Sequence, residues 1–460
     1  MNAQARTIAA QPAGRKRKEV GRFFPKGDLR TLHPKALWGY VRTQPLSFWM
    51  LNIYVFFEYV RPQQIYRSMG TLPYAQVSLL GAVAFLFMEG RRLKKPLATD
   101  YALMAFTGII LLSSLTAVRP DASMDSMQLW INWLLLYFLL VNIVDTEKRY
   151  FVYFVAFLLY SFKMSQHGMR GWIERGFSFT SWGMSGAPGW FQNSGEFAIQ
   201  MAIFIPLSLY FYLNHRHGWG WKMKLLVILM PISAAMSIMS SSSRGGMLAM
   251  AGVMAWLVLQ SKKKVKGALI AAVAGGIILV ALPQEFKDRF DTIGEDETSI
   301  NRQNYWDFGK EIMRERPVLG IGYANWLTYY HARFGYGALP HNIYIEAGAE
   351  LGYTGLVGFI ALIGATLWVN RKTRRAARKL GRDGEWFAGT ALGLDAAMVG
   401  FLIAGTFVTV LYYPFFWMNL AMTASLHHSV QHTLSQRRRA HLAELAARRT
   451  SPAALAGPGR

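Results

Sequence analysis

Residues 301–355 read NRQNYWDFGKEIMRERPVLGIGYANWLTYYHARFGYGALPHNIYIEAGAELGYTG. The first third of this stretch has helical periodicity. Its positions i, i+3, i+4, i+7, i+10 and i+11 form one face, made of Arg302, Tyr305, Trp306, Gly309, Ile312 and Met313. The opposite face is charged and consists of Asp307, Lys310, Glu311, Arg314 and Glu315. Pro317 is expected to end the helix. Arg302 is therefore predicted to lie in line with the aromatic face.

A polar, glycine-containing loop follows this helix and ends at Pro340-His341-Asn342. The chain is then apolar through residue 369, apart from Glu346 and Glu350. His341 is therefore predicted to lie where a long polar loop returns to a membrane. Along the new helix, three glycines are expected to form a small face for close packing: Gly348, Gly352 and Gly355.

The composition agrees with a membrane protein. Of the 460 residues, 52% are apolar and 14% aromatic, and several nearly uncharged runs are long enough to cross a hydrocarbon core of ~30 Å. The net charge of +24 would point to nucleic acid in a soluble protein, but here the basic residues lie in short clusters between apolar runs. The absence of cysteine excludes disulfides and thiol chemistry.

Twelve spans are predicted, and the fold class is therefore an all-α integral membrane protein. The ranges are 46–60, 72–89, 98–118, 126–144, 150–165, 195–213, 222–239, 244–260, 265–282, 343–369, 386–411 and 413–428. Residues 46–428 form the membrane domain, between basic tails at 1–45 and 429–460.

The charge distribution gives the orientation. Most of the 50 Lys and Arg residues lie in the two tails and in the loops near residues 91–95, 148–149, 216–224, 262–264 and 371–382. Both termini are therefore predicted to lie in the cytoplasm, with the chain in a bacterial inner membrane. Two long loops, 166–194 and 283–342, are predicted to be periplasmic.

Two arginines could bind an anion at the periplasmic surface. Arg244 follows Ser240–Ser243 and opens a span, so that exposed N–H groups lie nearby, although an interface anchor would look similar. Arg302 could be a solvated charge, but its guanidinium suits bidentate phosphate binding. Arg170 and Arg175 could extend such a surface.

His341 is the candidate general base, because its pKa lies near neutrality, although a lone histidine is often structural. His331 lacks a supporting motif. Glu346 and Glu350 would be costly in the bilayer unless paired, and we interpret both as mainly structural, with Glu350 as a possible supporting residue. Glu346 lies about 140° around a helix from His341, which makes it unsuited to orient the imidazole.

No metal or other cofactor is predicted. The nearest acidic cluster, Glu295-Asp296-Glu297, is more typical of a solvated turn than of converging metal ligands. Zinc spacing, a phosphate-binding loop and a serine-hydrolase elbow are absent from the sequence.

The chain resembles the O-antigen ligase/polymerase superfamily of bacterial membrane glycosyltransferases. The resemblance depends on Arg302 with Trp306 one turn later, on RPVLGIGYANW at 316–326, and on HNIYIEAGAELGYTG at 341–355. Two further segments, GAPGWF at 186–191 and NSGEF at 193–197, resemble the exosortase-associated ligases of this superfamily, and EYVRPQQIY at 58–66 does so more loosely.

The resemblance implies a GT-C-like glycosyltransferase whose donor is a glycan on undecaprenyl diphosphate. Arg244 and Arg302 would bind the diphosphate, His341 would accept the proton of an acceptor hydroxyl, and the anomeric configuration would invert without a metal. The acceptor stays open between lipid A–core sugar, the end of another glycan, and a protein serine or threonine. A polymerase of the same superfamily, a transporter or flippase of lipid-linked glycans, and a receptor or scaffold are the alternatives. A transporter typically has an internal repeat, which this sequence lacks.

Overall fold

The computed structural model describes residues 27–450, except residues 71, 181–182, 262, 282–283 and 285–296. Its secondary structure is helical, without a strand in the described residues. The helices are α1 Pro34–Val41, α2 Leu46–Tyr59, α3 Pro62–Ile65, α4 Tyr74–Met88, α5 Ala98–Leu115, α6 Pro120–Ile143, α7 Glu147–Glu174, α8 Ser194–His215, α9 Trp221–Ser240, α10 Arg244–Gln260, α11 Lys264–Ala281, α13 Glu297–Glu315, α14 Trp326–Phe334, α15 Ile343–Arg378, α16 Glu385–Gly405 and α17 Pro414–Thr450.

Each of the twelve predicted ranges overlaps one of these helices, although several ends differ. Six helical segments in the described residues are long and apolar enough to cross a membrane: those that contain α5, α6, α8, α9, α15 and α16. The helices α4 and α10 are apolar but shorter. The class of α-helical membrane protein is thereby confirmed, while the number of crossings stays a prediction.

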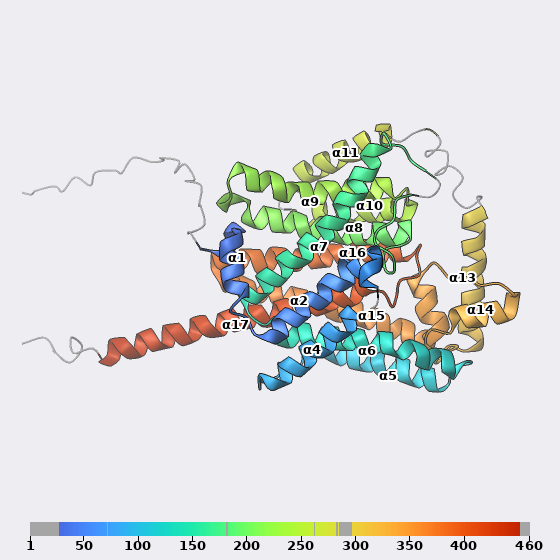
Figure 1. Ribbon diagram of the computed structural model, residues 1–460, viewed down its shortest axis with the longest axis horizontal. Coiled ribbons are helices and arrows are strands. Elements are labelled where there is room, and N and C mark those ends of the chain that lie inside the picture. The colour runs from blue at the N-terminus through green and yellow to red at the C-terminus, as the bar shows by residue number, and fades with distance from the viewer. Residues whose placement is uncertain are drawn as a thin grey trace, which may run out of the picture.

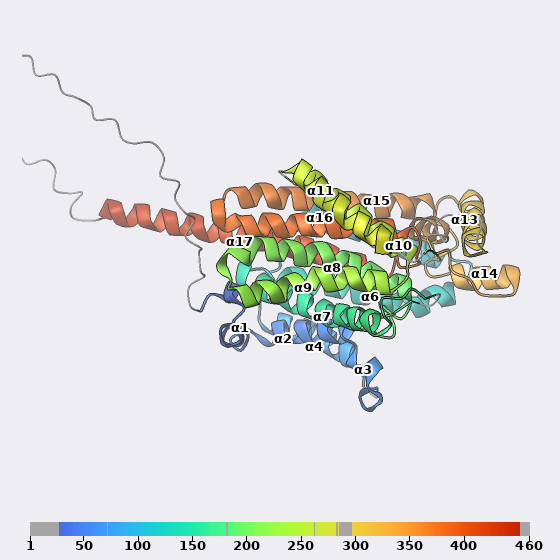
Figure 2. The ribbon, with the colours of Figure 1, turned by 90° about the horizontal axis from the view of Figure 1, so that it is seen from above.

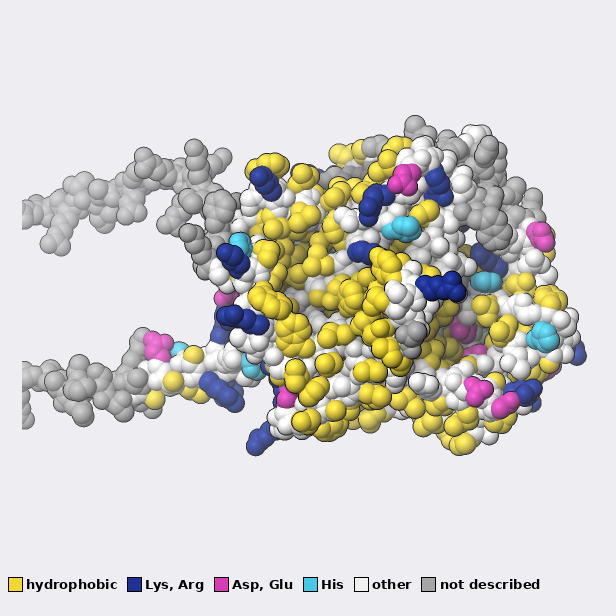
Figure 3. Space-filling model, viewed as in Figure 1, with side chains coloured by type: hydrophobic (Ala, Val, Ile, Leu, Met, Phe, Trp, Pro, Cys, Tyr) yellow, Lys and Arg dark blue, Asp and Glu magenta, His cyan; other side chains and the backbone are white. Residues whose placement is uncertain are grey.

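The long helices lie side by side along one axis of the molecule (Figures 1 and 2). At one end, which we call the site end, α13 and α14 lie beyond the other helices; at the opposite end the second half of α17 extends away from the bundle. Figure 3 shows hydrophobic side chains over the middle of one face, with Lys and Arg side chains gathered toward its two ends. This distribution is the one expected of a bundle that crosses a bilayer along its long axis.

The predicted loop 166–194 is too long, because α7 continues to Glu174. The predicted loop begins at Gln166, directly after the predicted span 150–165. The helix continues because its inner face stays small or apolar, with Met164 and Gly168 buried, while Lys163 and His167 are exposed. The connection to α8 therefore covers residues 175–193.

The predicted span 386–411 is also too long, since α16 ends at Gly405. An irregular connection of residues 406–413 leads to Pro414, the first residue of α17. This connection is mostly apolar and only partly exposed, which explains why hydropathy did not separate it from the helix.

The expectation of one continuous helix from residue 343 is wrong. The backbone breaks at Gly352, where φ is 69° and ψ is −173°. This conformation is essentially restricted to glycine. A Cβ at Gly352 would also overlap the backbone carbonyl of Val318. Gly352 is thus needed for the break rather than for a flat packing face, while Gly348 does pack closely, against Met313.

We expect Gly352→Ala to lower the thermal stability of the purified protein, because it adds backbone strain of about 1–3 kcal/mol and a clash with Val318. The matched control is Gly364→Ala in the same helix, where a Cβ would meet no atom within 4 Å. That control is expected to be neutral or slightly stabilising. Equal melting temperatures for the two variants would contradict the structural role of the break.

Candidate functional site

The helix α13 packs on the start of α15 through the face predicted from its periodicity. Gly309, Ile312 and Met313 are buried, whereas the predicted charged face is exposed. A Cβ at Gly309 would overlap Ile345, so the two helices are in direct contact at this point. The indole of Trp306 donates to the carbonyl of Pro340 over 2.9 Å. These contacts place α13 beside the residue that follows Pro340, His341.

The loop 316–326 is held by the break in α15. Carbonyls freed near Gly352 accept from the loop: Ala349 from Ile321 N–H at 3.0 Å and Glu350 from Gly322 N–H at 2.9 Å. The buried carboxylate of Glu350 accepts from the backbone N–H groups of Ala324, at 3.0 Å, and Trp326, at 2.9 Å. Backbone groups away from water need such partners. Glu350 therefore fixes the loop that carries the motif RPVLGIGYANW.

His341 lies between α13 and the connection 406–413. Its backbone has φ of 48°, a sparsely populated value for a residue other than glycine, and its N–H donates to Thr409 Oγ1 over 2.8 Å. Its ring centroid is 6.5 Å from that of Tyr305. Burial, and then the positive charge of Arg302, lower the pKa of His341 to about 4. The imidazole is therefore neutral at pH 7 and able to accept a proton. The charge that lowers its pKa belongs to Arg302, which lies one helical turn before Tyr305 in α13.

The connection 406–413 also reaches α10. Arg244, half-buried, is the first residue of this helix, whose N-cap Ser243 accepts from Gly246 N–H at 3.2 Å. A Cβ at Gly245 would lie 3.1 Å from Phe407. Because Phe407 and Thr409 belong to the same connection, the start of α10 and His341 both contact it. Arg244 begins α10, Arg302 belongs to α13 and His341 precedes α15; α13 lies at the site end (Figure 1).

The connection 175–193 covers the serine run before Arg244. Arg175 donates to the Ser240 carbonyl at 3.0 Å and to its hydroxyl at 2.9 Å. Met184 N–H donates to the same carbonyl over 2.9 Å, and Thr180 N–H donates to the Ser242 hydroxyl over 3.2 Å. Arg175 is therefore engaged in holding this connection. Arg170 is exposed on α7 and donates to the carbonyl of Gln166 over 3.3 Å.

The three segments with exosortase-associated resemblance meet at the site end. Trp190 Nε1 donates to Glu58 Oε2 over 2.6 Å, and the Arg61 guanidinium lies 5.5 Å from the Trp190 ring centroid. The ring of Tyr413 lies 5.0 Å from that of Trp190. Glu196, in the segment NSGEF, accepts from Asn193 N–H over 3.1 Å and so caps α8. These segments therefore form one contact region with the end of the connection 406–413.

Other candidates do not join this group. His331 is exposed on α14. Glu346 accepts from Leu411 N–H over 3.2 Å, which ties α15 to the connection 406–413. Glu295 and Asp296 lie outside the described residues, and Glu297 is the first residue of α13. Among the residues that are described, no three His, Asp or Glu side chains lie close enough to hold a metal ion.

The connection 406–413, which contacts both His341 and Gly245, was not predicted from the sequence. A signal was present: the predicted spans 386–411 and 413–428 left one residue between two helices that must reverse direction. The apolar run had to contain a turn, and Tyr412-Tyr413-Pro414 marks its end because proline favours the first turn of a helix.

Residues 225–360 match the family model of the O-antigen ligase. The match contains Arg244, Arg302 and His341, as well as the loop 316–326 and the break at Gly352. It confirms the resemblance to the O-antigen ligase/polymerase superfamily in this segment. No curated protein matches the chain.

Proposed function

We propose that this protein transfers a glycan from an undecaprenyl-diphosphate donor to an acceptor hydroxyl at the periplasmic face of the inner membrane. The proposal is supported by two contacts of the connection 406–413, with His341 and with Gly245, which follows Arg244, and by the charge that Arg302 places near His341. Two cations and a neutral imidazole at the membrane surface are the groups that such a reaction needs. The O-antigen ligase match supports a glycosyltransferase of this type.

The arginines are assigned to the diphosphate. A guanidinium binds phosphate through two parallel N–H donors and stays charged at all accessible pH values. Burial lowers the pKa of His341 most, and the positive charge of Arg302 lowers it further. When the bond from the anomeric carbon to the diphosphate breaks, negative charge grows on the leaving oxygen, and Arg244 and Arg302 would stabilise it. This assignment needs no metal ion.

His341 is assigned as the general base. Its neutral ring would accept the proton of the acceptor hydroxyl while the hydroxyl oxygen attacks the anomeric carbon. The new C–O bond forms as the bond to the diphosphate breaks, so the configuration at that carbon inverts. The hydrogen bond from His341 N–H to Thr409 fixes the backbone, and Glu350 and Arg175 act as positioning residues for the surrounding loops.

A polymerase, in which the acceptor is the end of another glycan, uses the same chemistry at the same residues. The contact region around Trp190 favours an acceptor other than lipid A–core, because its segments resemble exosortase-associated ligases. A transporter would bind the lipid-linked glycan without breaking its glycosidic bond to diphosphate.

The test is turnover of a defined undecaprenyl-diphosphate glycan by the purified protein, with lipid A–core, free glycan and serine-containing peptide as separate acceptors. Release of undecaprenyl diphosphate together with glycosylation of one acceptor supports the proposal and identifies the acceptor. Binding of the donor without turnover on any acceptor would favour a transporter.

The proposed orientation makes a topology prediction. Reporter fusions at Lys95, Lys263 and Lys379 should read cytoplasmic, and fusions at Asp121, Glu295 and Leu339 should read periplasmic, because basic loops stay inside. A periplasmic signal at Lys263 would contradict the orientation, since Arg244 begins α10 and Lys263 follows its other end.

A further inference from the structure

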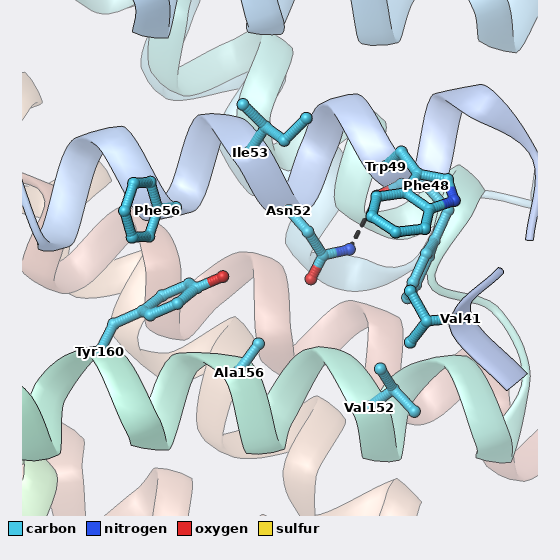
Figure 4. A pocket seen from close by; sticks show the side chains of 9 residues that line it. All are labelled: Val41, Phe48, Trp49, Asn52, Ile53, Phe56, Val152, Ala156 and Tyr160. Atoms are coloured by element: carbon cyan, nitrogen blue, oxygen red, sulfur yellow. Dashed lines mark hydrogen bonds between the residues drawn. The ribbon is translucent and has the colours of Figure 1, made fainter. Parts of the chain in front are cut away.

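An apolar groove runs between α2 and α7 on the surface of the bundle (Figure 4). It encloses a cavity of about 250 Å³. The residues that line it are Val41, Phe48, Trp49, Asn52, Ile53, Phe56, Val152, Ala156 and Tyr160. The amide of Asn52 donates to the Phe48 carbonyl at 2.7 Å, so this donor is satisfied within α2. The groove therefore offers a hydrophobic lining to an apolar chain.

The same face of α7 continues into basic residues. Tyr160 lines the groove, and Lys163, His167 and Arg170 follow at i+3, i+7 and i+10, which keeps them within one side of a helix. All three are exposed. Figure 3 shows this change along α7, with hydrophobic surface over its first half and basic side chains beside a histidine over its second half. Glu174, the acidic residue of this face, lies one turn beyond Arg170.

This face is distinct from the diphosphate site. Arg175 contacts Ser240, near Arg244, but it lies about 140° around the helix from Arg170. Gly168 points toward α9, where a Cβ would overlap Ser237. The basic face of α7 is therefore directed away from the connection to the serine run, on the side of the groove.

We propose that this face of α7 binds an anionic phospholipid, with one acyl chain in the groove and its phosphate headgroup against Lys163, His167 and Arg170. The groove from Val152 to Tyr160 rises by about 12 Å, close to the depth of one leaflet of a ~30 Å core. Val41 of α1 lines its far end, so a much longer polyprenyl chain would have to leave it. Basic side chains at a membrane surface attract acidic lipids, so the headgroup is expected to carry a negative charge.

The experiment uses the full-length protein in phosphatidylcholine nanodiscs with trace phosphatidylglycerol that carries a photoreactive acyl chain. Crosslinks are expected on the peptides of α2 and α7 that line the groove. Lys163→Gln with Arg170→Gln should weaken this labelling roughly 30-fold, because each basic side chain contributes about fivefold. The matched control, Arg314→Gln with Arg333→Gln, removes the same charge from exposed positions at the same end and should leave labelling unchanged.

A second variant tests the groove itself. Ala156→Trp should block labelling while Lys163 and Arg170 stay in place, and an unchanged melting temperature would show that the protein is folded. Equal labelling by photoreactive phosphatidylcholine, or unchanged labelling of the double variant, would overturn the proposal. So would displacement of the probe by equimolar undecaprenyl phosphate, which would identify a prenyl carrier as the occupant. Because the readout is lipid binding, it does not depend on glycan transfer.

Discussion

Replacement of His341 by alanine is expected to lower the rate of glycan transfer roughly 10²–10⁴-fold, the usual loss for a general base. The affinity for the donor should change little, because diphosphate binding is assigned to the arginines. Stability should be retained, since the contact that holds this position is the backbone N–H of His341 to Thr409, which the substitution keeps. The measurement is donor affinity beside transfer rate, at equal protein concentration in the membrane.

His331→Ala is the matched control, because it removes an exposed histidine at the same end of the molecule. It should keep the wild-type rate. If His341→Ala transferred glycan at a near-normal rate while donor affinity collapsed, His341 would be a binding residue and the assignment of the base would be wrong.

The parts of the site with a strong local pattern could be predicted from the sequence. The periodicity of α13 gave the correct buried and exposed faces, because a surface helix buries one stripe regardless of what covers it. The end of this helix before Pro317 and the start of α15 after His341 were predictable for the same reason. The residues RPVLGIGYANW were correctly expected to form an irregular loop, since they contain Gly320 and Gly322, which both have positive φ.

The break at Gly352 could not be predicted from local sequence. The segment EAGAELGYTG is compatible with a continuous apolar helix, and nothing within it requires an interruption. The break exists because residues far along the chain satisfy the freed backbone groups: Ile321 and Gly322 bind the carbonyls of Ala349 and Glu350, and Tyr353 N–H donates to the Pro317 carbonyl over 2.8 Å. Such partners become visible only once the chain is folded.

The contact region around Trp190 could not be predicted from local sequence either, because its partners are far apart in the chain. The sequence indicated that its segments resemble one group of ligases, but Glu58 and Trp190 are separated by 132 positions. The pairing of an indole donor with a half-buried carboxylate leaves no periodic signal. The basic face of α7 was not predicted for another reason. Its polar residues have helical spacing, but they were interpreted as the start of a loop.

Arg302 is expected to show the second large effect. Arg302→Ala should weaken donor binding and lower the transfer rate, because it removes charge from the diphosphate site. Arg302→Lys keeps the charge but loses the planar pair of donors, so it should still impair turnover. The matched control is Arg314→Lys on the exposed face of α13, which should transfer at the wild-type rate. Wild-type donor affinity in Arg302→Ala would contradict a role in diphosphate binding.

The pH dependence separates this role from simple loss of structure. Burial is the first cause of the low pKa of His341, and the charge of Arg302 lowers it further, to about 4. Removal of that charge by Arg302→Ala makes protonation of His341 easier and so raises its pKa. Because the base must be unprotonated, the acidic limb of kcat/KM, which reports the free enzyme, should move to higher pH in Arg302→Ala. In Arg302→Lys the charge remains, and the limb should stay close to its wild-type position although the rate has fallen. An acidic limb at the same pH in all three proteins would show that Arg302 does not act on His341, and the two residues would then have to be placed in separate parts of the site.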